Sequence, residues 1–263
     1  MTVHYEDRGP RGGDAPPVLL AGSLGTTLRV WDPQVDALTG QGRRTIAYDQ
    51  RGHGASPVPP GPYSIADLGA DALALMDHLE IARASFVGLS IGGMVGQWLA
   101  AHAPERIDRL VLLCTTAHLP PAQSWHDRAA AVRAAGTVDV IADAVVARWV
   151  TPAYAAARPD AVEALRAMLA AQPPEGYAAC CEAIAAMDLR DELAAIAAPA
   201  LVIGGAQDPA IPTEHQRHLA THIAGARLEI LDPGAHVVSV ERPDAVTALI
   251  AEHLDRDRER EPA

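Results

Sequence analysis

The chain has 263 residues, of which 49 % are hydrophobic, which suits one sizeable domain or a domain with an insertion. Its formal net charge of −12 argues against nucleic acid and anionic membranes as partners. All 21 basic residues are arginine, which excludes Schiff-base chemistry on lysine. No apolar run is long enough to cross a membrane, residues 1–7 lack a signal-peptide core, and the cysteines form no disulfide framework. We therefore expect a cytoplasmic protein.

Strands and helices alternate in the first part of the chain. Ser64 and Asp67 resemble a capping box, which opens an amphipathic helix with its apolar residues on one face. Another helix is expected at 91–102. Apolar runs predict buried strands at 17–21, 44–48, 85–89 and 108–114. The alternation is typical of an α/β fold whose twisted, mostly parallel sheet is flanked by helices.

The rhythm changes between residues 117 and 187, where no convincing strand is present. This alanine-rich segment predicts helices around 125–135, 138–149 and 161–171, and we expect a helical cap over the site. Strands return at 200–204 and 227–231, an amphipathic helix follows Pro243, and the mixed-charge tail 255–261 is expected to fray. The predicted organisation is a core of residues 1–116 and 188–263 interrupted by a cap of residues 117–187.

A Gly-x-Ser-x-Gly motif links the third predicted strand to the helix after it. The motif spans residues 88–92, with Ser90 at its centre. On its own the pattern is common, but strand, motif and helix follow in the order of a nucleophile elbow. Gly88 and Gly92 let the strand and the helix approach each other around the serine. Ser90 is therefore the predicted nucleophile.

Two further polar residues follow later strands. Asp208 comes just after the strand at 200–204, and His236 lies in the loop after the strand at 227–231. Functional groups of open α/β sheets gather at the carboxyl ends of strands, and the chain order Ser90, Asp208, His236 is the order that a nucleophile-elbow fold requires. We predict that His236 is the general base and that Asp208 orients it. The alternatives are a turn aspartate before proline and an ordinary loop histidine.

Backbone amides are expected to form an oxyanion hole. One donor is the residue after the nucleophile, Ile91, and the other should lie in the loop at 22–25. Leu24 is the preferred second donor and Ser23 the alternative. A plain glycine-rich turn is the competing interpretation of this loop.

Other candidates carry weaker signals. His215, His218 and His222 share one face of a predicted helix, a spacing that metal sites use, but we favour a solvated polar face. We predict neither a metal nor a cofactor. His53, between two glycines, is interpreted as a turn residue, and Trp31 either lines the pocket or packs in the core.

Several stretches carry a likeness to a known family: residues 22–27, 31–34, 48–56, 59–64 and 88–99. With them the chain resembles the α/β-hydrolase superfamily and, within it, the 3-oxoadipate enol-lactone hydrolases. The resemblance implies an α/β-hydrolase fold and a serine hydrolase without a cofactor. It implies that the enzyme opens the ring of 3-oxoadipate enol-lactone in the β-ketoadipate pathway of aromatic catabolism.

The implied substrate is a small anionic lactone, whose carboxylate needs a cation in an otherwise apolar pocket. Trp125 and Arg128 match a family-like Trp-x-x-Arg pattern and lie one helical turn apart. Arg133, and Arg148 beside Trp149, are further cap candidates. The residues expected to contact the substrate are Ser23, Trp125, Arg128 and Trp149.

Two other functions fit the same residues. A broader carboxylesterase or lactonase would prefer neutral esters to carboxylated lactones. A ligand-binding receptor that kept the triad would turn over negligibly. The sequence does not indicate an oligomeric state.

Overall fold

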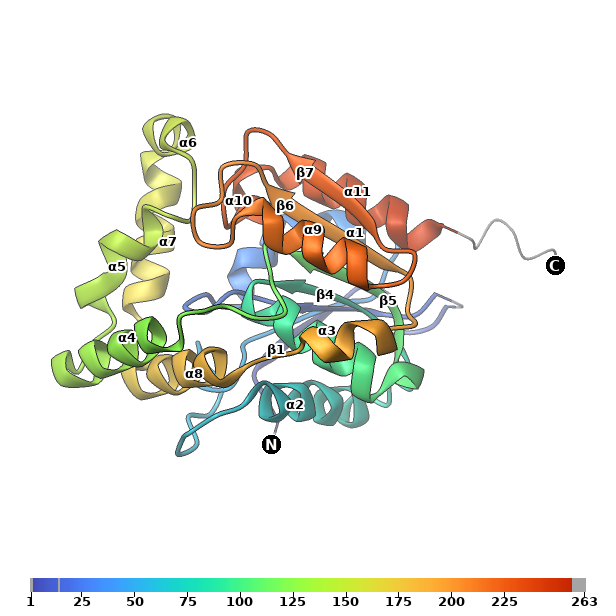
Figure 1. The fold of residues 1–263 in the computed structure, drawn as a ribbon. Coiled ribbons are helices and arrows are strands. Elements are labelled where there is room, and N and C mark those ends of the chain that lie inside the picture. The colour runs from blue at the N-terminus through green and yellow to red at the C-terminus, as the bar shows by residue number, and fades with distance from the viewer. Residues whose placement is uncertain (1, 14, 257–263) are drawn as a thin grey trace.

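A seven-stranded sheet runs through the computed structural model, which describes residues 2–13 and 15–256 (Figure 1). The strands are β1 (Tyr5–Arg8), β2 (Val18–Ala21), β3 (Thr45–Tyr48), β4 (Ala84–Leu89), β5 (Ile107–Leu113), β6 (Ala200–Gly205) and β7 (Arg227–Leu231). Their order is β1-β3-β2-β4-β5-β6-β7, and β1 pairs antiparallel with β3 while the other pairs are parallel. The predicted α/β fold with a mostly parallel sheet is confirmed.

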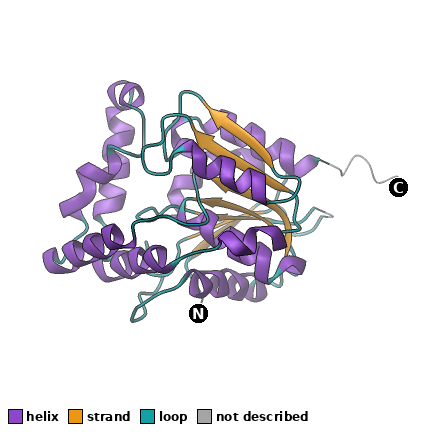
Figure 2. Ribbon diagram, viewed as in Figure 1, coloured by secondary structure: helices purple, strands orange, loops and turns teal. Residues whose placement is uncertain are grey.

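Helices cover both faces of the sheet (Figure 2). The helices α2 (Ile65–His78), α3 (Ile91–His102) and α9 (Thr213–His222) lie on one face, and α1 (Asp32–Gly40) and α11 (Pro243–Asp255) lie on the other. Strands covered on both faces read as continuous apolar runs, which is why β2, β4 and β6 were visible in the sequence. The predicted capping box is present, since Ser64 Oγ accepts from Asp67 N and the Asp67 side chain accepts from Ser64 N.

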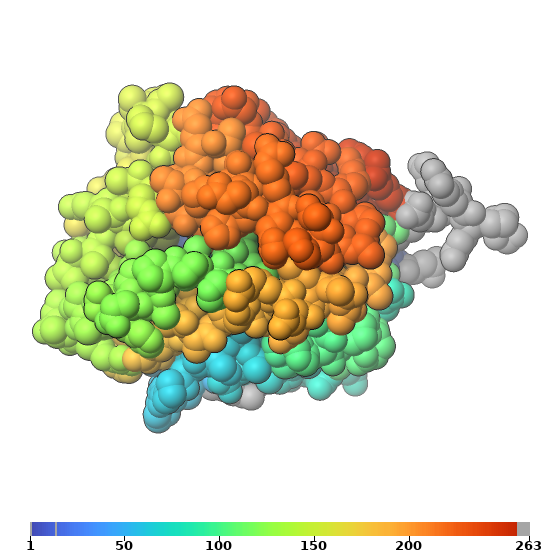
Figure 3. Space-filling model, viewed as in Figure 1, coloured from blue at the N-terminus to red at the C-terminus, as the bar shows by residue number. Residues whose placement is uncertain are grey.

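A group of helices separates β5 from β6. It comprises α4 (Ala122–Ala135), α5 (Asp139–Val146), α6 (Pro152–Ala157), α7 (Pro159–Ala170) and α8 (Pro174–Ala186). These helices form one end of the molecule, coloured from green through yellow-green to amber in Figure 3, and α4 packs along α8. The three predicted helical stretches correspond to α4, α5 and α7, whereas α6 and most of α8 were not predicted. Short helices complete the chain: η1 (Leu28–Trp31), η2 (Pro104–Arg106), η3 (Arg190–Ala195) and α10 (Val238–Glu241).

The first strand, β1, was not predicted. Its sequence, Tyr-Glu-Asp-Arg, has no apolar run, because β1 is an edge strand whose residues are all half-buried. Pairing with β3 and an ion pair between Asp7 and Arg44, 2.9 Å apart, hold it in place. Tertiary pairing thus overrides a weak local preference. The predicted fray at 255–261 lies mostly outside the described residues, and α11 itself continues to Asp255.

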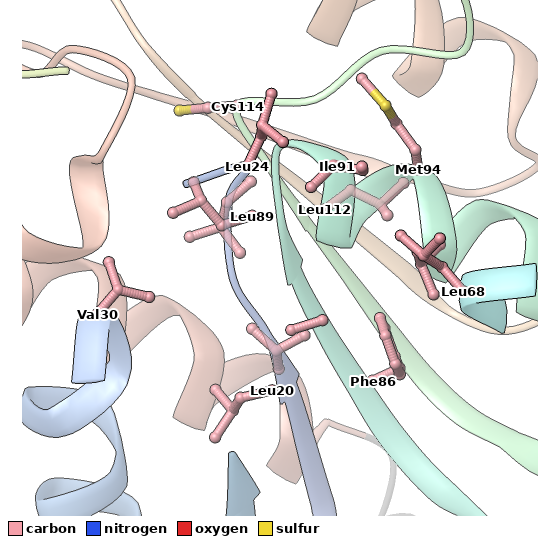
Figure 4. Packing of buried hydrophobic residues seen from close by; sticks show 14 of the residues in the cluster. Leu20, Leu24, Val30, Leu68, Phe86, Leu89, Ile91, Met94, Leu112 and Cys114 are labelled. Atoms are coloured by element: carbon pink, nitrogen blue, oxygen red, sulfur yellow. The ribbon is translucent and has the colours of Figure 1, made fainter. Parts of the chain in front are cut away.

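Buried apolar side chains fix the strand that carries the Gly-x-Ser-x-Gly motif. Phe86 and Leu89 of β4 point to opposite faces of the sheet, Phe86 toward α3 and Leu89 toward the side of Leu20 (Figure 4). Both are fully buried, as is Met94 of α3. A core packed this densely holds the end of β4 in one position.

No helix within the described residues has the length and apolarity needed to cross a membrane.

Candidate active site

Ser90 lies at the sharp turn between β4 and α3. Its backbone has φ 57° and ψ −117°, a conformation that L-residues rarely adopt, and its N–H donates to Leu113 O at 2.9 Å. A Cβ on Gly88 would lie 2.2 Å from Gly92 O, and a Cβ on Gly92 would lie 2.2 Å from Ala21 O. Both positions therefore exclude any side chain, so the two glycines have the steric role that the motif predicted.

Asp208 and His236 form a buried pair at the ends of β6 and β7. Asp208 Oδ2 lies 2.8 Å from His236 Nδ1. Its other oxygen, Oδ1, accepts from the backbone N–H of Ala210 at 2.8 Å and of Ile211 at 3.0 Å. With Oδ1 occupied by these donors, Oδ2 is available to accept from Nδ1–H. That tautomer leaves His236 Nε2 without a proton and able to accept one.

The side chains of Ser90 and His236 lie together in the wall of one cavity. The predicted contact residues Ser23, Trp125, Arg128 and Trp149 also line it, as does Leu24, the predicted oxyanion donor. Six lining residues were not among the predicted site residues: Leu119, Val145, Arg148, Tyr177, Ala210 and Ile211. Arg148 was named only as one of several further arginine candidates.

The loop after β2 leaves two of its amides without an acceptor. The N–H groups of residues 25–28 all donate within the protein: Gly25 to His53, Thr26 to Ser23 O, Thr27 to Met168 and Leu28 to Asp49. Within residues 2–13 and 15–256, no acceptor meets the N–H of Ser23 or Leu24, nor that of Ile91 at the start of α3. Leu24 lines the cavity, and Ile91 directly follows Ser90, which also lines it, so both predicted oxyanion donors have an N–H that no acceptor in the described chain occupies.

Comparison with known proteins agrees with this geometry. Residues 16–243 match the model of the alpha/beta hydrolase fold family. The chain belongs to the α/β-hydrolase family. It is 44 % identical over 243 residues to 3-oxoadipate enol-lactonase 2 of Acinetobacter baylyi, and the match covers 92 % of this chain and 90 % of the relative.

Solved structures of other ester hydrolases superpose closely on this hydrolase. The enol-lactonase from Burkholderia xenovorans superposes with a TM-score of 0.93 at 44 % identity, covering 97 % of this chain and 96 % of that one. A thermophilic esterase from Thermogutta terrifontis, solved with malate bound, superposes with a TM-score of 0.90 at 29 % identity, covering 97 % and 93 %. The protein is an ester-hydrolysing enzyme of the α/β-hydrolase fold.

The helical segment between β5 and β6 carries two arginines that have no acidic partner among the described residues. Arg128 lies 4.6 Å from the centroid of the Trp125 ring, and Arg148 lies beside Trp149. Among the described residues neither arginine pairs with a carboxylate, whereas Arg133, exposed on α4, lies 2.7 Å from Glu175. Burial, and after it the charge of Arg128, lowers the pKa of Arg148. Arg133 is thus removed from the candidates and Arg148 joins Arg128.

Tyr177 of α8 completes this side of the cavity. Its side chain is fully buried, and no atom of the described chain meets hydrogen-bonding geometry with its hydroxyl. Burial raises the pKa of Tyr177, so the hydroxyl stays a neutral donor, while the positive charge of Arg128 acts in the opposite direction. Nothing in the sequence indicated Tyr177, because the position of α8 depends on its packing against α4 and against the turn after β3, which are distant in the chain.

The remaining candidates lie elsewhere. His215 Nδ1 is 2.9 Å from Thr116 Oγ1, and the rings of His218 and His222 are 4.0 Å apart. The described residues contain no group of three histidine, cysteine or acidic side chains that could hold a metal ion. Trp31 is fully buried and does not line the cavity. His53 lies in a turn, as predicted, but its ring is also buried and hydrogen-bonded.

Proposed function

We propose that this enzyme hydrolyses 3-oxoadipate enol-lactone to 3-oxoadipate with a Ser90–His236–Asp208 triad. The observation that carries the proposal is one cavity whose wall holds Ser90, His236 and two arginines that meet no carboxylate within the described part of the chain. The first pair suits attack on an ester, and the second suits an anionic substrate. The relatives named enol-lactonases support the choice of lactone.

Acylation begins at the lactone carbonyl. Ser90 Oγ attacks the carbonyl carbon while His236 Nε2 accepts the hydroxyl proton, and the Asp208 carboxylate stabilises the imidazolium. The carbonyl oxygen becomes an oxyanion that accepts from the amides of Leu24 and Ile91. The ring C–O bond then breaks, and the enol oxygen leaves with the proton of His236. The acyl group stays attached to Ser90 as an ester.

Deacylation repeats these steps with water. His236 Nε2 takes a proton from water as its oxygen attacks the acyl carbon, and returns that proton to Ser90 Oγ as the ester breaks. The enol released from the ring becomes the ketone, which makes ring opening favourable. The product is 3-oxoadipate, and the reaction belongs to the β-ketoadipate pathway of aromatic catabolism.

The cap binds the free carboxylate of the substrate in this proposal. Arg128 and Arg148 supply positive charge, and the Tyr177 hydroxyl supplies a further donor. The apolar remainder of the lactone contacts Trp125 and Trp149, and Ser23 borders the reacting ester. We accordingly divide the chain into a catalytic core, residues 1–116 and 188–263, and a substrate-binding cap, residues 117–187.

A rate comparison tests the proposal. The values of kcat/KM for 3-oxoadipate enol-lactone and for a neutral nitrophenyl ester are measured with the wild type and with Ser90→Ala. We expect the lactone to be preferred and both activities to be lost in the variant. Faster turnover of the neutral ester, with activity still dependent on Ser90, would favour a general esterase, for which the malate-bound esterase is a precedent. One equivalent of product without steady-state turnover would indicate a receptor.

A further inference from the structure

The loop that carries Leu24 is held from one side by a single neighbouring segment. Gln50 Nε2 donates to Gly22 O at 2.7 Å, His53 Nε2 accepts from Gly25 N at 2.9 Å, and Asp49 Oδ1 accepts from Leu28 N at 2.6 Å. All three side chains come from the turn between β3 and α2, residues 49–56. They are 3 %, 5 % and 1 % exposed for Asp49, Gln50 and His53, so solvent cannot replace the bonds.

These contacts enclose the two amides that have no acceptor. Gly22 precedes Ser23, and Gly25 follows Leu24, so the bonds of Gln50 and His53 fix the chain on both sides of the free N–H groups. An oxyanion donor is effective only when it is aimed before the reaction starts, because reorienting it costs free energy during the reaction. Thr26 N closes a turn on Ser23 O at 3.0 Å, but no helix or strand lies between residues 22 and 27, so contacts from outside the loop have to fix the direction of this turn.

We propose that His53 is a positioning residue that aims the Leu24 amide into the oxyanion hole, with Asp49 and Gln50 supporting the same loop. This inference rests on the proposed function, because it takes Leu24 as an oxyanion donor. Of the three side chains, His53 acts nearest to the donor, because its Nε2 accepts from the N–H of Gly25, the residue directly after Leu24. It touches no substrate and acts only through the backbone of Gly25.

The protonation state of His53 suits this role. Its Nδ1 lies 3.3 Å from Arg51 O, so Nδ1 carries the hydrogen and Nε2 is free to accept. Burial lowers the pKa of His53 to about 4, while the bond to Arg51 O and the charge of Asp49 act in the opposite direction. The only other titratable ring beside it is that of Tyr177, whose centroid is 6.4 Å away among the described residues. His53 is therefore a neutral acceptor near pH 7.

The segment is also fixed against the cap. Gly54 N donates to Gln172 Oε1 at 2.9 Å, and a Cβ on Gly52 would lie only 2.6 Å from Gly176 Cα. The backbones of the turn and of α8 are thus in direct contact. Since Tyr177 of α8 lines the cavity, the turn lies between the substrate-binding cap and the loop of Leu24.

A pair of substitutions separates the acceptor from the bulk of the side chain. In His53→Gln, Oε1 is the same number of bonds from Cβ as Nε2 of histidine, so it can accept from Gly25 N. His53→Met has similar length without a strong acceptor. The control is His253→Met, which removes another buried histidine, one that bonds Pro199 O at the far side of the core. Thermal unfolding is measured for all three variants.

Activity is measured first on a nitrophenyl ester and then on the enol-lactone. Removing one oxyanion donor costs about 10²–10³-fold in kcat, so we expect a misaimed donor in His53→Met to lower kcat about 10- to 100-fold with KM within about twofold. His53→Gln should recover most of that loss, within about fivefold of the wild type. His253→Met should change the melting temperature without changing kcat.

Two results would overturn the inference: a kcat of His53→Met within twofold of the wild type, or equal losses in His53→Met and His53→Gln at equal melting temperatures. The ester arm separates this outcome from failure of the proposed function. If the wild type hydrolyses the ester through Ser90 but not the lactone, the substrate assignment fails while the His53 comparison still holds. If Ser90→Ala retains ester turnover, the proposed function fails and the role of His53 fails with it.

Discussion

The two sides of the cavity are built by different kinds of structure. Ser90, Asp208 and His236 follow β4, β6 and β7, so the hydrogen-bonded sheet determines where they lie. The opposite side comes from α4, α5 and α8 and the segment after α5, which no strand supports. There the positions of Arg128 and Tyr177 depend on how helices pack against one another.

In the proposed function, the residues at the sheet edge carry out the reaction, and the residues on the helices select the substrate. Groups that must meet within hydrogen-bonding distance sit on the rigid sheet edge, as the 2.8 Å contact between Asp208 and His236 illustrates. In the proposed function, the groups that recognise the rest of the substrate sit on helices whose sequence can change without disturbing the strands. Variants of the sheet edge should therefore abolish turnover on every ester, and variants of the cap should alter only the choice of ester.

The largest effect is expected for Ser90→Ala. Without the hydroxyl no acyl-enzyme forms, and kcat/KM should fall by about 10⁴-fold or more on lactone and ester alike. Ser124→Ala, in an exposed position of α4, is the matched control and should keep wild-type rates. Labelling with a fluorophosphonate followed by mass spectrometry checks the same point. Labelling of any residue other than Ser90 would show that the nucleophile does not lie at the end of β4.

Asp208→Asn should come next. The amide keeps the size of the carboxylate, but its NH₂ group cannot accept from His236 Nδ1–H, so the wrong tautomer is favoured and kcat should fall by about 10⁴-fold. Circular dichroism and thermal unfolding establish that the variant is folded. The measurement is kcat on both substrates, and a loss confined to the lactone would contradict the division between core and cap.

The sheet side of the site could be predicted from the sequence, since it follows local rules. Buried parallel strands are apolar runs, and polar residues directly after them reach one edge. The glycines at 88 and 92 are required because backbone oxygens occupy the space of their side chains. Asp208 and His236, although 28 residues apart, could be paired because β6 and β7 are adjacent and in parallel register.

The cap side could be predicted only in part. The Trp-x-x-Arg spacing pointed to Arg128, but the choice between Arg133 and Arg148 depends on which face of each helix meets the core. Arg133 binds Glu175 across the contact between α4 and α8, a pairing with no sequence signature. Tyr177 and the bond from Gly25 to His53 likewise depend on contacts between segments far apart in the chain.

Substitution of the two cavity arginines should lower the activity less, and only on the anionic lactone. A hydrogen bond to a charged group contributes about 1.5–3 kcal/mol, so Arg128→Gln and Arg148→Gln should each lower kcat/KM for the anionic lactone by about 10- to 100-fold. The rate on a neutral ester should change less than about threefold. Arg133→Gln, on the outside of the cap, is the control. Equal losses on both substrates would show that the arginines hold the fold together rather than select the substrate.

The smallest expected effect is on the free energy of unfolding in acid, which should depend on a buried histidine of the core and not on the cap. Burial lowers the pKa of His253 to about 4, so the unfolded chain binds a proton at this residue between about pH 6.5 and 4 while the folded chain does not. The free energy of unfolding should therefore be unaffected above pH 6.5 and fall with decreasing pH, by at most about 1.4 kcal/mol per pH unit from this group.

Urea denaturation at intervals from pH 7 to pH 4 measures this slope. His253→Gln, which keeps a donor for Pro199 O, should flatten it by about that amount. His126→Gln, in an exposed position of α4, should leave the slope unchanged. If His126→Gln flattened the slope more than His253→Gln, the cap rather than the core would limit stability in acid. That result would contradict the assignment of acid sensitivity to the core.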